Sequence, residues 1–444
     1  MPTIAHVPRR LAACSWGGTE RVLAQTLPLL RQGGLRQRVL TTRALDQRRG
    51  DELSGAPVTR HSYLYPEWPL SEERRAQYDR RAGNMVSFSL ARHLLHLKDL
   101  ALVHCHTGNR LGAQCLRVAR RRGVPCVLTL HGGHFAVPDD EKRRGEQRRE
   151  LRDVFRARTL PWGKVLSLLW DTRNLLENVD AVVCVGIEEY EAAKKALKRP
   201  RVVLMPGGVD VSTFQGGGRE RGRRLLEVPE DARLIVSVAR LDPQKDQETL
   251  LRAWRRLEDE QVFLALVGAE TEPGYAARLR ELAAASGDRL RIVDNMPSER
   301  IPDVLAAADI AVLPSRHEPF GLSCLEAWAA GTCLVASNVG GPRWLLKGET
   351  AGRLFSAGDS VELCALLREL LDDPAQCARL SREGEQRARA EFTWEHRAEA
   401  LLDLYASLGV RWERRSLGGS AESPSSIASG DPHSRRARRK EAAT

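Results

Sequence analysis

Residues 309–331 read "DIAVLPSRHEPFGLSCLEAWAAG". A short apolar run, Ile310–Leu313, leads into a loop, and an apolar helical pattern opens just after Phe320. A strand, a loop and a helix in this order form the repeating unit of parallel α/β proteins, whose ligands bind beyond the carboxyl ends of the strands. Two carboxylates, Glu318 and Glu326, stand eight positions apart across the loop. The stretch therefore predicts a parallel α/β fold, with a ligand-binding site at the carboxyl edge of its sheet.

The same alternation of short apolar runs and longer amphipathic stretches continues along the chain. Helical patterns fill the gaps between the runs, for example at 246–257, 275–285 and 362–371. Two series of strands with intervening helices predict two similar Rossmann-like domains, each a doubly wound parallel sheet. The expected strands are 3–7, 38–42, 100–105, 126–130, 181–185 and 202–205 in the first series, and 234–238, 263–267, 290–293, 310–313 and 333–336 in the second.

The domain boundary is expected near residue 215, where three glycines interrupt the apolar pattern. We therefore expect an N-terminal domain at 1–215 and a C-terminal domain at 216–391. Residues 135–175 break the alternation and are expected to form a helical insertion. Residues 411–444 form a basic tail, rich in Ser, Gly, Pro and Arg towards its end, that is expected to be disordered.

Composition is that of a globular protein, with 42% hydrophobic and 29% charged residues among 444. The sequence contains no apolar run near the length that a membrane span requires. The nine cysteines are an odd number without a CxxC pair. Reduced, mostly buried thiols and a cytoplasmic location are therefore the expectation.

The formal charge of +11 is concentrated in two segments. Residues 141–160 and 411–444 each carry seven Arg and one Lys against four acids, a net +4 apiece, so only +3 remains for the rest of the chain. Neither segment interleaves aromatic residues for stacking on bases, and nucleic acid is not an expected partner. Peripheral contact with an anionic membrane is one use for such patches, and a solvated helix face plus a tail is the other.

Residues that follow the predicted strands are the candidates for a site. Gly17 and Gly18 stand before a helix and give an anion close access to its N-terminus, although a plain turn explains them equally. His131 directly follows an apolar strand, where it would point into the cleft between the domains. A metal pair of His131 and His134 is the competing hypothesis, but no carboxylate or Cys nearby completes a ligand set.

Two cations follow the first strand of the second series. Arg240 and Lys245 stand five positions apart across an Asp-Pro turn, which can bring both to one anion such as a diphosphate. A surface loop without a ligand is the alternative explanation.

The opening stretch adds the groups that would hold the rest of a ligand. The helix that begins after Gly321 can bind phosphate oxygens with its first amides. Glu326 can accept two hydrogen bonds from a vicinal diol such as ribose, and Glu318 can reach hydroxyls of the group that the diphosphate carries. The alternative is that Glu318 is a charge at a helix N-terminus and Glu326 lies on a solvated face.

At these residues the chain resembles the family 4 retaining glycosyltransferases, which have the GT-B fold. The stretch "HEPFGLSCLEAWAAG" is similar to their E-x7-E signature, and "VSVARLDPQKD" to their Arg/Lys diphosphate clamp. The stretches "VGGPRWLLKGETAGRLFSAGD", "SWGGTE" and "PGGVDVSTF" also resemble the family, although "PNGVD" is more usual in the last. The likeness covers roughly residues 1–410 and is more specific in the second half. It implies that a last helix, within 392–410, crosses back onto the first domain.

The resemblance implies a role for each matching residue. Glu318 would bind hydroxyls of the donor sugar, His131 would lie by the sugar near its C6 hydroxyl, and Glu326 would hold the ribose. The remaining donor-binding groups are the glycines Gly17 and Gly18, the cations Arg240 and Lys245 that would stabilise the departing diphosphate, and the segment of Phe320, Gly321, Leu322 and Ser323 whose amides would bind phosphate.

The implied reaction moves a sugar from a nucleotide-sugar donor to a hydroxyl of a glycan, a lipid-linked glycan or a small molecule, with retention at the anomeric carbon. Cations and amides would stabilise the leaving group, so neither a cofactor nor a metal is expected. A sugar-nucleotide epimerase of the same fold and a non-catalytic binding protein are the alternatives. The sequence does not identify the nucleobase, the sugar, the acceptor or the oligomeric state.

Overall fold

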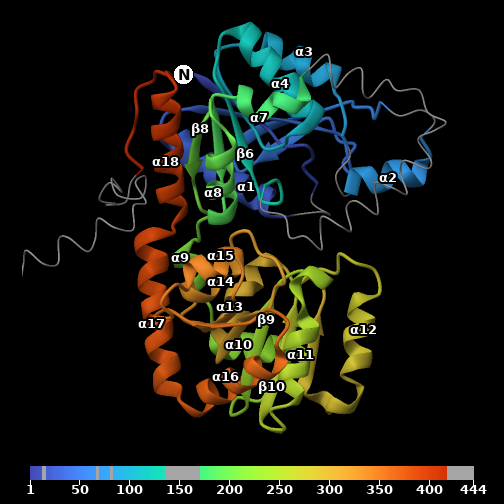
Figure 1. Ribbon diagram of the computed structural model, residues 1–444, viewed down its shortest axis with the longest axis vertical. Helices are drawn as coiled ribbons and strands as arrows, with labels where there is room; N and C mark the ends of the chain where they lie inside the picture. Colours follow the sequence, from blue (N-terminus) through green and yellow to red (C-terminus); the bar gives the residue numbers. More distant parts are fainter. Residues whose placement is uncertain (13–16, 67–69, 81–83, 136–170, 418–444) are drawn as a thin grey trace, which may run out of the picture.

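A computed structural model of the chain shows two α/β domains stacked one above the other (Figure 1). A column of two helices near the end of the described chain runs along one side of both domains. The expected insertion lies outside the described residues except for its two ends. The structure describes residues 1–12, 17–66, 70–80, 84–135 and 171–417.

Within the described part of the chain, eight strands form the sheet of the first domain, in the order β3-β4-β2-β1-β5-β6-β7-β8. All neighbours pair in parallel except β3 and β4, which are antiparallel. The central strands are apolar runs buried on both faces, as a parallel sheet between helical layers requires. The strands are β1 (Thr3–Val7), β2 (Arg36–Thr42), β3 (Gly50–Leu53), β4 (Ala56–His61), β5 (Leu100–Cys105), β6 (Cys126–Leu130), β7 (Ala181–Cys184) and β8 (Arg201–Leu204).

Six further strands among the described residues form the parallel sheet of the second domain, in the order β11-β10-β9-β12-β13-β14. Two hydrophobic clusters cover its two faces, one of them centred on the buried Trp328. The strands are β9 (Arg233–Val238), β10 (Val262–Val267), β11 (Leu290–Val293), β12 (Ile310–Leu313), β13 (Cys333–Ser337) and β14 (Arg353–Phe355).

Helices connect the strands, and several begin at a residue whose side chain accepts a hydrogen bond from the first turn. No helix in the described ranges is both long and apolar enough to cross a membrane. In the first half of the chain the helices are α1 (Gly18–Gln32), α2 (Glu72–Arg80), α3 (Phe88–His96), α4 (Asn109–Arg122), η2 (Thr172–Asn174), α7 (Leu175–Asn178), α8 (Ile187–Ala196) and α9 (Val211–Gln215). The later helices are α10 (Arg219–Leu226), η3 (Pro243–Lys245), α11 (Gln247–Arg255), α12 (Tyr275–Leu282), η4 (Ala284–Arg289), η5 (Ser298–Arg300), α13 (Ile301–Ala307), α14 (Leu322–Ala329), α15 (Gly340–Leu345), α16 (Ser360–Asp372), α17 (Pro374–Glu391) and α18 (Trp394–Ser407).

The strands expected from the sequence are all present within one or two residues, and the prediction of two parallel-sheet domains is confirmed. Three further strands, β3, β4 and β14, were not expected. β3 reads "GDEL" and has no apolar run, because it lies at the sheet edge. The turn between β3 and β4 has positive φ at Ser54 and Gly55, and this Ser-Gly pair is the signal that predicts a hairpin.

Helix α18 returns from the second domain and packs on the first. Its apolar residues recur with helical spacing, and they share one buried cluster with residues of α1 and of the first sheet. Arg397 on this helix is buried, and its guanidinium donates hydrogen bonds to the carbonyls of Met205 and Pro206. The chain passes between the domains twice, near Val209 and near Phe392. The two segments are hydrogen-bonded to each other, since the Val209 amide donates to the Phe392 carbonyl at 2.8 Å.

The expectation of a disordered tail from residue 411 onwards is corrected for residues 411–417. The Trp412 indole donates to the Gly33 carbonyl at 2.9 Å, and the Leu417 side chain is buried. Arg414 forms ion pairs with Glu399 and Asp403 on α18. This segment therefore extends the packing of α18, while the rest of the expected tail lies outside the described residues.

The domains approach each other closely at Pro319. A Cβ atom added to Gly132 would lie 2.4 Å from the Pro319 ring, and one added to Gly186 would lie 2.2 Å from the Pro319 carbonyl oxygen. Gly207 allows the same close approach of Leu322. The loop before α14 is thus seated against backbone of the first domain that carries no side chains.

We predict that Gly186→Ala destabilises the protein by about 1–3 kcal/mol, because the new methyl group would overlap the Pro319 carbonyl. Gly186 has φ −113°, so alanine brings no backbone strain of its own. Urea unfolding of the variant beside Gly216→Ala measures the effect. Gly216 is a matched control, since its Cβ would meet its nearest neighbour at an ordinary 3.4 Å. Equal midpoints for the two variants would mean that the domains do not approach this closely in solution.

Candidate functional site

The candidate site lies between the domains, around the loop that connects β12 to α14. Gly321 has φ +95°, which turns the chain into the helix. The Gly341 amide donates to the Glu318 carbonyl at 2.9 Å. Cβ atoms at Gly340 and Gly341 would lie 2.3 Å and 2.0 Å from the carbonyl oxygens of Glu318 and Phe320. The loop is therefore held by close backbone contacts with Gly340 and Gly341.

Glu318 and Lys245 form an ion pair at the centre of this region. Their side chains are only 12% and 15% exposed, so the pair is shielded from bulk water. Lys245 ends the short helix η3, whose first turn is capped by Asp242 through the Gln244 amide at 2.9 Å. The structure thus brings together two residues that were predicted to serve one ligand.

Arg240 lies on the same loop with different partners. Its guanidinium is 3.7 Å from an oxygen of Asp242 and donates to the Thr271 hydroxyl at 3.3 Å. The side chain is about half exposed. The structure therefore does not show Arg240 and Lys245 on a common partner, although both follow β9 and stand at its carboxyl end.

Glu326 on α14 forms an ion pair with Arg21 on α1, which links the two domains. The Glu326 side chain is 7% exposed, and burial raises the pKa of its carboxyl, while the Arg21 guanidinium opposes that rise. Arg21 lies in the first turn after Gly17 and Gly18. The start of α1 is therefore placed opposite α14.

The two glycines differ in their surroundings. The Gly17 amide donates to the Glu20 carboxylate at 3.0 Å, which caps α1. Gly18 is exposed, and an added Cβ would meet nothing within 4 Å. Of the pair, Gly18 therefore presents open backbone at the start of the helix.

Two other predicted residues have structural partners. The Phe320 side chain is buried in the core of the second domain, near the rings of Trp344 and Phe392. The Ser323 hydroxyl donates to the Val238 carbonyl at 2.9 Å. For these residues it is the main chain at the start of α14, and not the side chain, that remains a candidate for binding.

His131 follows β6 and belongs to a chain of hydrogen-bonded side chains. Its Nε2 lies 3.3 Å from Nδ1 of His106, whose Nε2 lies 3.2 Å from Nδ1 of His6. The His6 Nε2 in turn lies 2.9 Å from the Gln37 oxygen. Burial, with the Arg397 cation acting in the same direction, lowers the pKa of His131 to about 3. His131 is therefore neutral at physiological pH.

His134 is held in the structure through its main chain. The main-chain amides of His134 and Phe135 donate to the buried Glu189 carboxylate at 3.1 and 3.0 Å, which fixes the turn after His131.

The histidines that approach ligand spacing in the described chain are His6, His104 and His106, of which one ring nitrogen each lies within 4.8 Å of the others. All six ring nitrogens of these residues have a hydrogen-bond partner. Those of His6 and His106 belong to the chain described above, and those of His104 bond to Tyr405 at 2.6 Å and to Thr129 at 2.7 Å. A metal would have to replace these bonds, so the geometry favours a hydrogen-bonded network.

Sequence reasoning missed Arg21 and the residues behind His131. Arg21 comes directly after the "GGTE" stretch, which marks the helix but not its partner 305 positions away. His106 stands in "LVHCH", where a second histidine after a strand is a usable signal. His6 and Gln37 lie inside strands and give no such signal.

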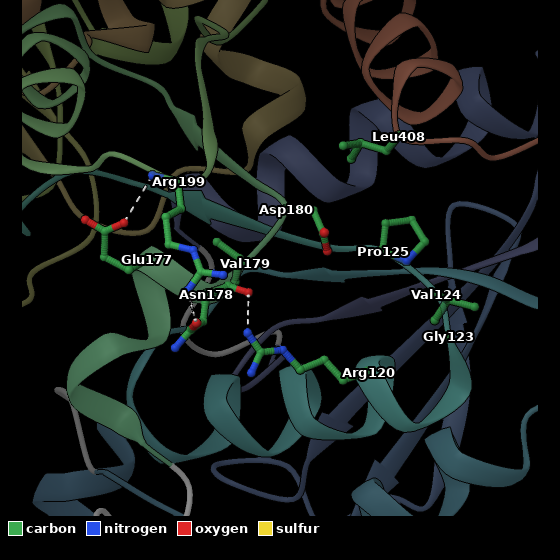
Figure 2. A pocket seen from close by; sticks show the side chains of 10 residues that line it. All are labelled: Arg120, Gly123, Val124, Pro125, Glu177, Asn178, Val179, Asp180, Arg199 and Leu408. Atoms are coloured by element: carbon green, nitrogen blue, oxygen red, sulfur yellow. Dashed lines mark hydrogen bonds between the residues drawn. The ribbon is translucent and has the colours of Figure 1, made fainter.

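A hollow in the first domain lies away from this site. It has a volume of about 490 Å³ and lies at the amino ends of β6 and β7, beside Pro125 and Asp180 (Figure 2). Arg120 crosses it and donates to the Asn178 carbonyl at 3.1 Å. Since His131 follows the carboxyl end of β6, the hollow is at the opposite edge of the sheet and takes no part in the site.

Two family models match adjacent parts of the chain. The model described as Glycosyltransferase Family 4 matches residues 16–213, and the model described as Glycosyl transferases group 1 matches residues 218–387.

Similar curated proteins carry the name D-inositol 3-phosphate glycosyltransferase. The protein from Salinispora tropica is 35% identical over 321 residues, which cover 68% of this chain and 63% of the relative. A protein from Catenulispora acidiphila is 28% identical over 368 residues, covering 80% and 82%. In the relative from Thermobispora bispora, 35% identical, the match spans only 54% of its length. The chain thus spans between half and two thirds of the length of the relatives from Thermobispora bispora and Salinispora tropica.

Solved structures agree on the architecture. Sucrose-phosphate synthase from Thermosynechococcus elongatus has a TM-score of 0.67 at 23% identity, covering 92% of this chain and 99% of that one. HepE from Anabaena, solved in complex with UDP, has a TM-score of 0.68 at 17% identity, covering 92% and 100%. The chain therefore belongs to the group 1 glycosyltransferases, and its two stacked parallel-sheet domains have the GT-B fold.

Proposed function

We propose that the protein is a retaining glycosyltransferase that moves a sugar, most simply a hexose, from a nucleoside-diphosphate donor to a hydroxyl acceptor without a metal. The observation that carries the proposal is the arrangement around α14. Glu318 and Lys245 meet before the helix, and Glu326 lies within it opposite the glycine loop of α1. One helix thus presents groups suited to a sugar, a diphosphate and a ribose in order along the chain.

Charge develops on the diphosphate as its bond to the sugar breaks. Lys245, Arg240 and the amides at the start of α14 would stabilise that charge, because preorganised donors act strongly in a shielded site. Lys245 would exchange part of its contact with Glu318 for the diphosphate, which leaves Glu318 to accept hydroxyls of the sugar. The hypothesis for retention is attack on the same face, with a leaving phosphate oxygen taking the acceptor's proton.

The epimerase alternative needs an acid/base carboxylate in the first domain. Two buried carboxylates of the first domain, Glu20 and Glu189, both accept hydrogen bonds from main-chain amides and hold turns in place. These contacts favour the transferase. A non-catalytic protein of the same fold is the other alternative, and the paired, shielded state of Lys245 and Glu318 argues for a working site.

The acceptor is a proposal at the level of chemical class: a glycan, a lipid-linked glycan or a small molecule. The names of the relatives add inositol 3-phosphate as the first small molecule to try. A cytoplasmic enzyme that makes cell-envelope polysaccharide, with peripheral contact to an anionic membrane, is also part of the proposal. Flotation with anionic liposomes at low salt tests that contact.

The direct test is product analysis in the presence of EDTA. The protein is incubated with nucleoside-diphosphate sugars and an acceptor panel that includes inositol 3-phosphate, and proton NMR assigns the anomeric configuration of the product. Retained configuration with full activity in EDTA is expected. An inverted product, or activity that EDTA abolishes, would contradict the proposal.

For Lys245→Met we predict a fall in turnover of about 100- to 1,000-fold, with a much smaller change in donor affinity, because the lost charge acts mainly on the leaving group. Initial rates over a donor concentration series separate the two constants. Lys347→Met is the matched control, since Lys347 is exposed in the same domain. Normal turnover in Lys245→Met would remove the proposed role of this residue.

Donor binding should weaken as pH falls, because only the ionised Glu326 carboxylate accepts both hydroxyls of a ribose. Burial raises the pKa of Glu326, so the loss should begin at a higher pH than for an ordinary glutamate. Arg21→Met removes the cation that opposes this rise, and the loss should move to still higher pH. Glu326→Gln should bind about 10- to 100-fold more weakly at neutral pH and lose this pH dependence.

Calorimetric titration of the three proteins with a nucleoside diphosphate between pH 4 and 8 measures these effects. A midpoint in Arg21→Met that is equal to or lower than that of the wild type would contradict the assignment of Glu326.

A further inference from the structure

The side chains behind His131 form one line across four neighbouring strands. Gln37 lies in β2, His6 in β1, His106 directly after β5 and His131 directly after β6, and β2-β1-β5-β6 is the order of these strands in the sheet. The donor–acceptor distances along the line are 2.9, 3.2 and 3.3 Å. Gln37 and His6 are nearly inaccessible to water, with exposures of 3% and 1%.

Gln37 gives this line a direction. Its amide nitrogen donates to the Leu35 carbonyl at 3.1 Å, so its oxygen is the atom that faces His6. A flipped amide would place two acceptors, the Gln37 oxygen and the Leu35 carbonyl oxygen, against each other. The His6 Nε2 must therefore carry a proton, which it donates to Gln37.

The donor and acceptor roles of each ring are set by those of its neighbour, because each histidine is neutral. Burial lowers the pKa of His6 to about 4 and that of His106 well below its ordinary value, and His131 is neutral as described above. A neutral imidazole has one donor and one acceptor nitrogen. With its proton on Nε2, His6 accepts at Nδ1 from the Nε2 proton of His106. By the same rule His106 accepts at Nδ1 from the Nε2 proton of His131.

We infer that Gln37, acting through His6 and His106, fixes His131 as the Nε2-protonated tautomer, so that the Nδ1 atom of His131 is a hydrogen-bond acceptor. Gln37, His6 and His106 are positioning residues. Within the proposed function, on which this last step rests, the Nδ1 atom of His131 accepts a hydrogen bond from a hydroxyl of the donor sugar and discriminates against a sugar that cannot donate one. A site with the opposite tautomer would favour an acceptor group on the sugar.

His104 provides the internal control. It stacks on His106 with ring centroids 4.4 Å apart, yet its nitrogens bond to Tyr405 and Thr129 and not to the line. Removing the Tyr405 hydroxyl therefore deletes a buried hydrogen bond of the same cluster without breaking the path from Gln37 to His131.

The test is nitrogen-15 NMR of the full chain labelled in histidine, where two-bond proton correlations show which ring nitrogen carries the proton. Substitution of His131 by Asn assigns its signal. The wild-type protein should show His131 protonated on Nε2. Gln37→Met removes the oxygen that accepts the proton of His6 Nε2. A substantial share of His131 should then move to the Nδ1-protonated form, whereas Tyr405→Phe should keep the wild-type pattern.

His131 protonated on Nδ1 in the wild-type protein would overturn the inference even if Gln37→Met does not fold. A wild-type pattern in a folded Gln37→Met would overturn it as well, and so would histidine signals that move on addition of EDTA, because these would show a bound metal. None of these measurements needs a nucleotide sugar. Their outcome is therefore independent of whether the proposed function is correct.

The sugar contact has its own readout. A donor whose hydroxyl near His131 is replaced by fluorine should bind about tenfold more weakly to the wild-type protein, because fluorine cannot donate a proton. The ratio of the dissociation constants of the fluorinated and the ordinary donor should fall towards one in Gln37→Met and stay at the wild-type value in Tyr405→Phe. Equal binding of both donors to a wild-type protein with the expected tautomer would contradict the proposed sugar contact alone.

Discussion

Close packing of the loop before α14 against bare backbone of the first domain sets the relation between the two sheets. Pro319 fits between Gly132 and Gly186 because neither residue has a side chain, and Leu322 approaches Gly207 for the same reason. This contact brings the carboxyl end of β6, which delivers His131, towards the carboxyl end of β12. The ion pair of Arg21 with Glu326 depends on that approach, since its two residues come from different domains.

The two carboxylates of the site are shielded from water, and each is paired with a cation. A charge removed from water is tolerated when a partner of opposite charge or several hydrogen bonds accompany it. Lys245 with Glu318, and Arg21 with Glu326, meet that condition. Behind them the histidine line keeps its rings neutral and satisfies their nitrogens with one another. The charged side chains thus lie in fixed positions between the domains, whereas the polar side chains inside the first sheet are neutral.

The sequence predicted the parts of the fold that depend on local pattern. Buried strands such as Cys126–Leu130 are continuous apolar runs, whereas Gly50–Leu53 has no such run because it lies at an edge. The spacing of Glu318 and Glu326 likewise predicted two carboxylates around one helix start. Their partners were not predictable, because an ion pair between residues 305 positions apart is a product of domain packing. The roles assigned to these residues stay predictions until a ligand is bound.

The central claim is a metal-independent site for a nucleotide sugar between the domains. Thermal unfolding with UDP, GDP, ADP and their common sugars, with EDTA present, tests it most directly. A ligand at a hundred times its dissociation constant should add about 2.7 kcal/mol of stability if it binds only the folded protein. We expect a clear shift with one nucleotide family, which identifies the donor base, and its loss in Glu326→Ala. No shift with any member of the panel, or a shift that Glu326→Ala retains, would contradict the account.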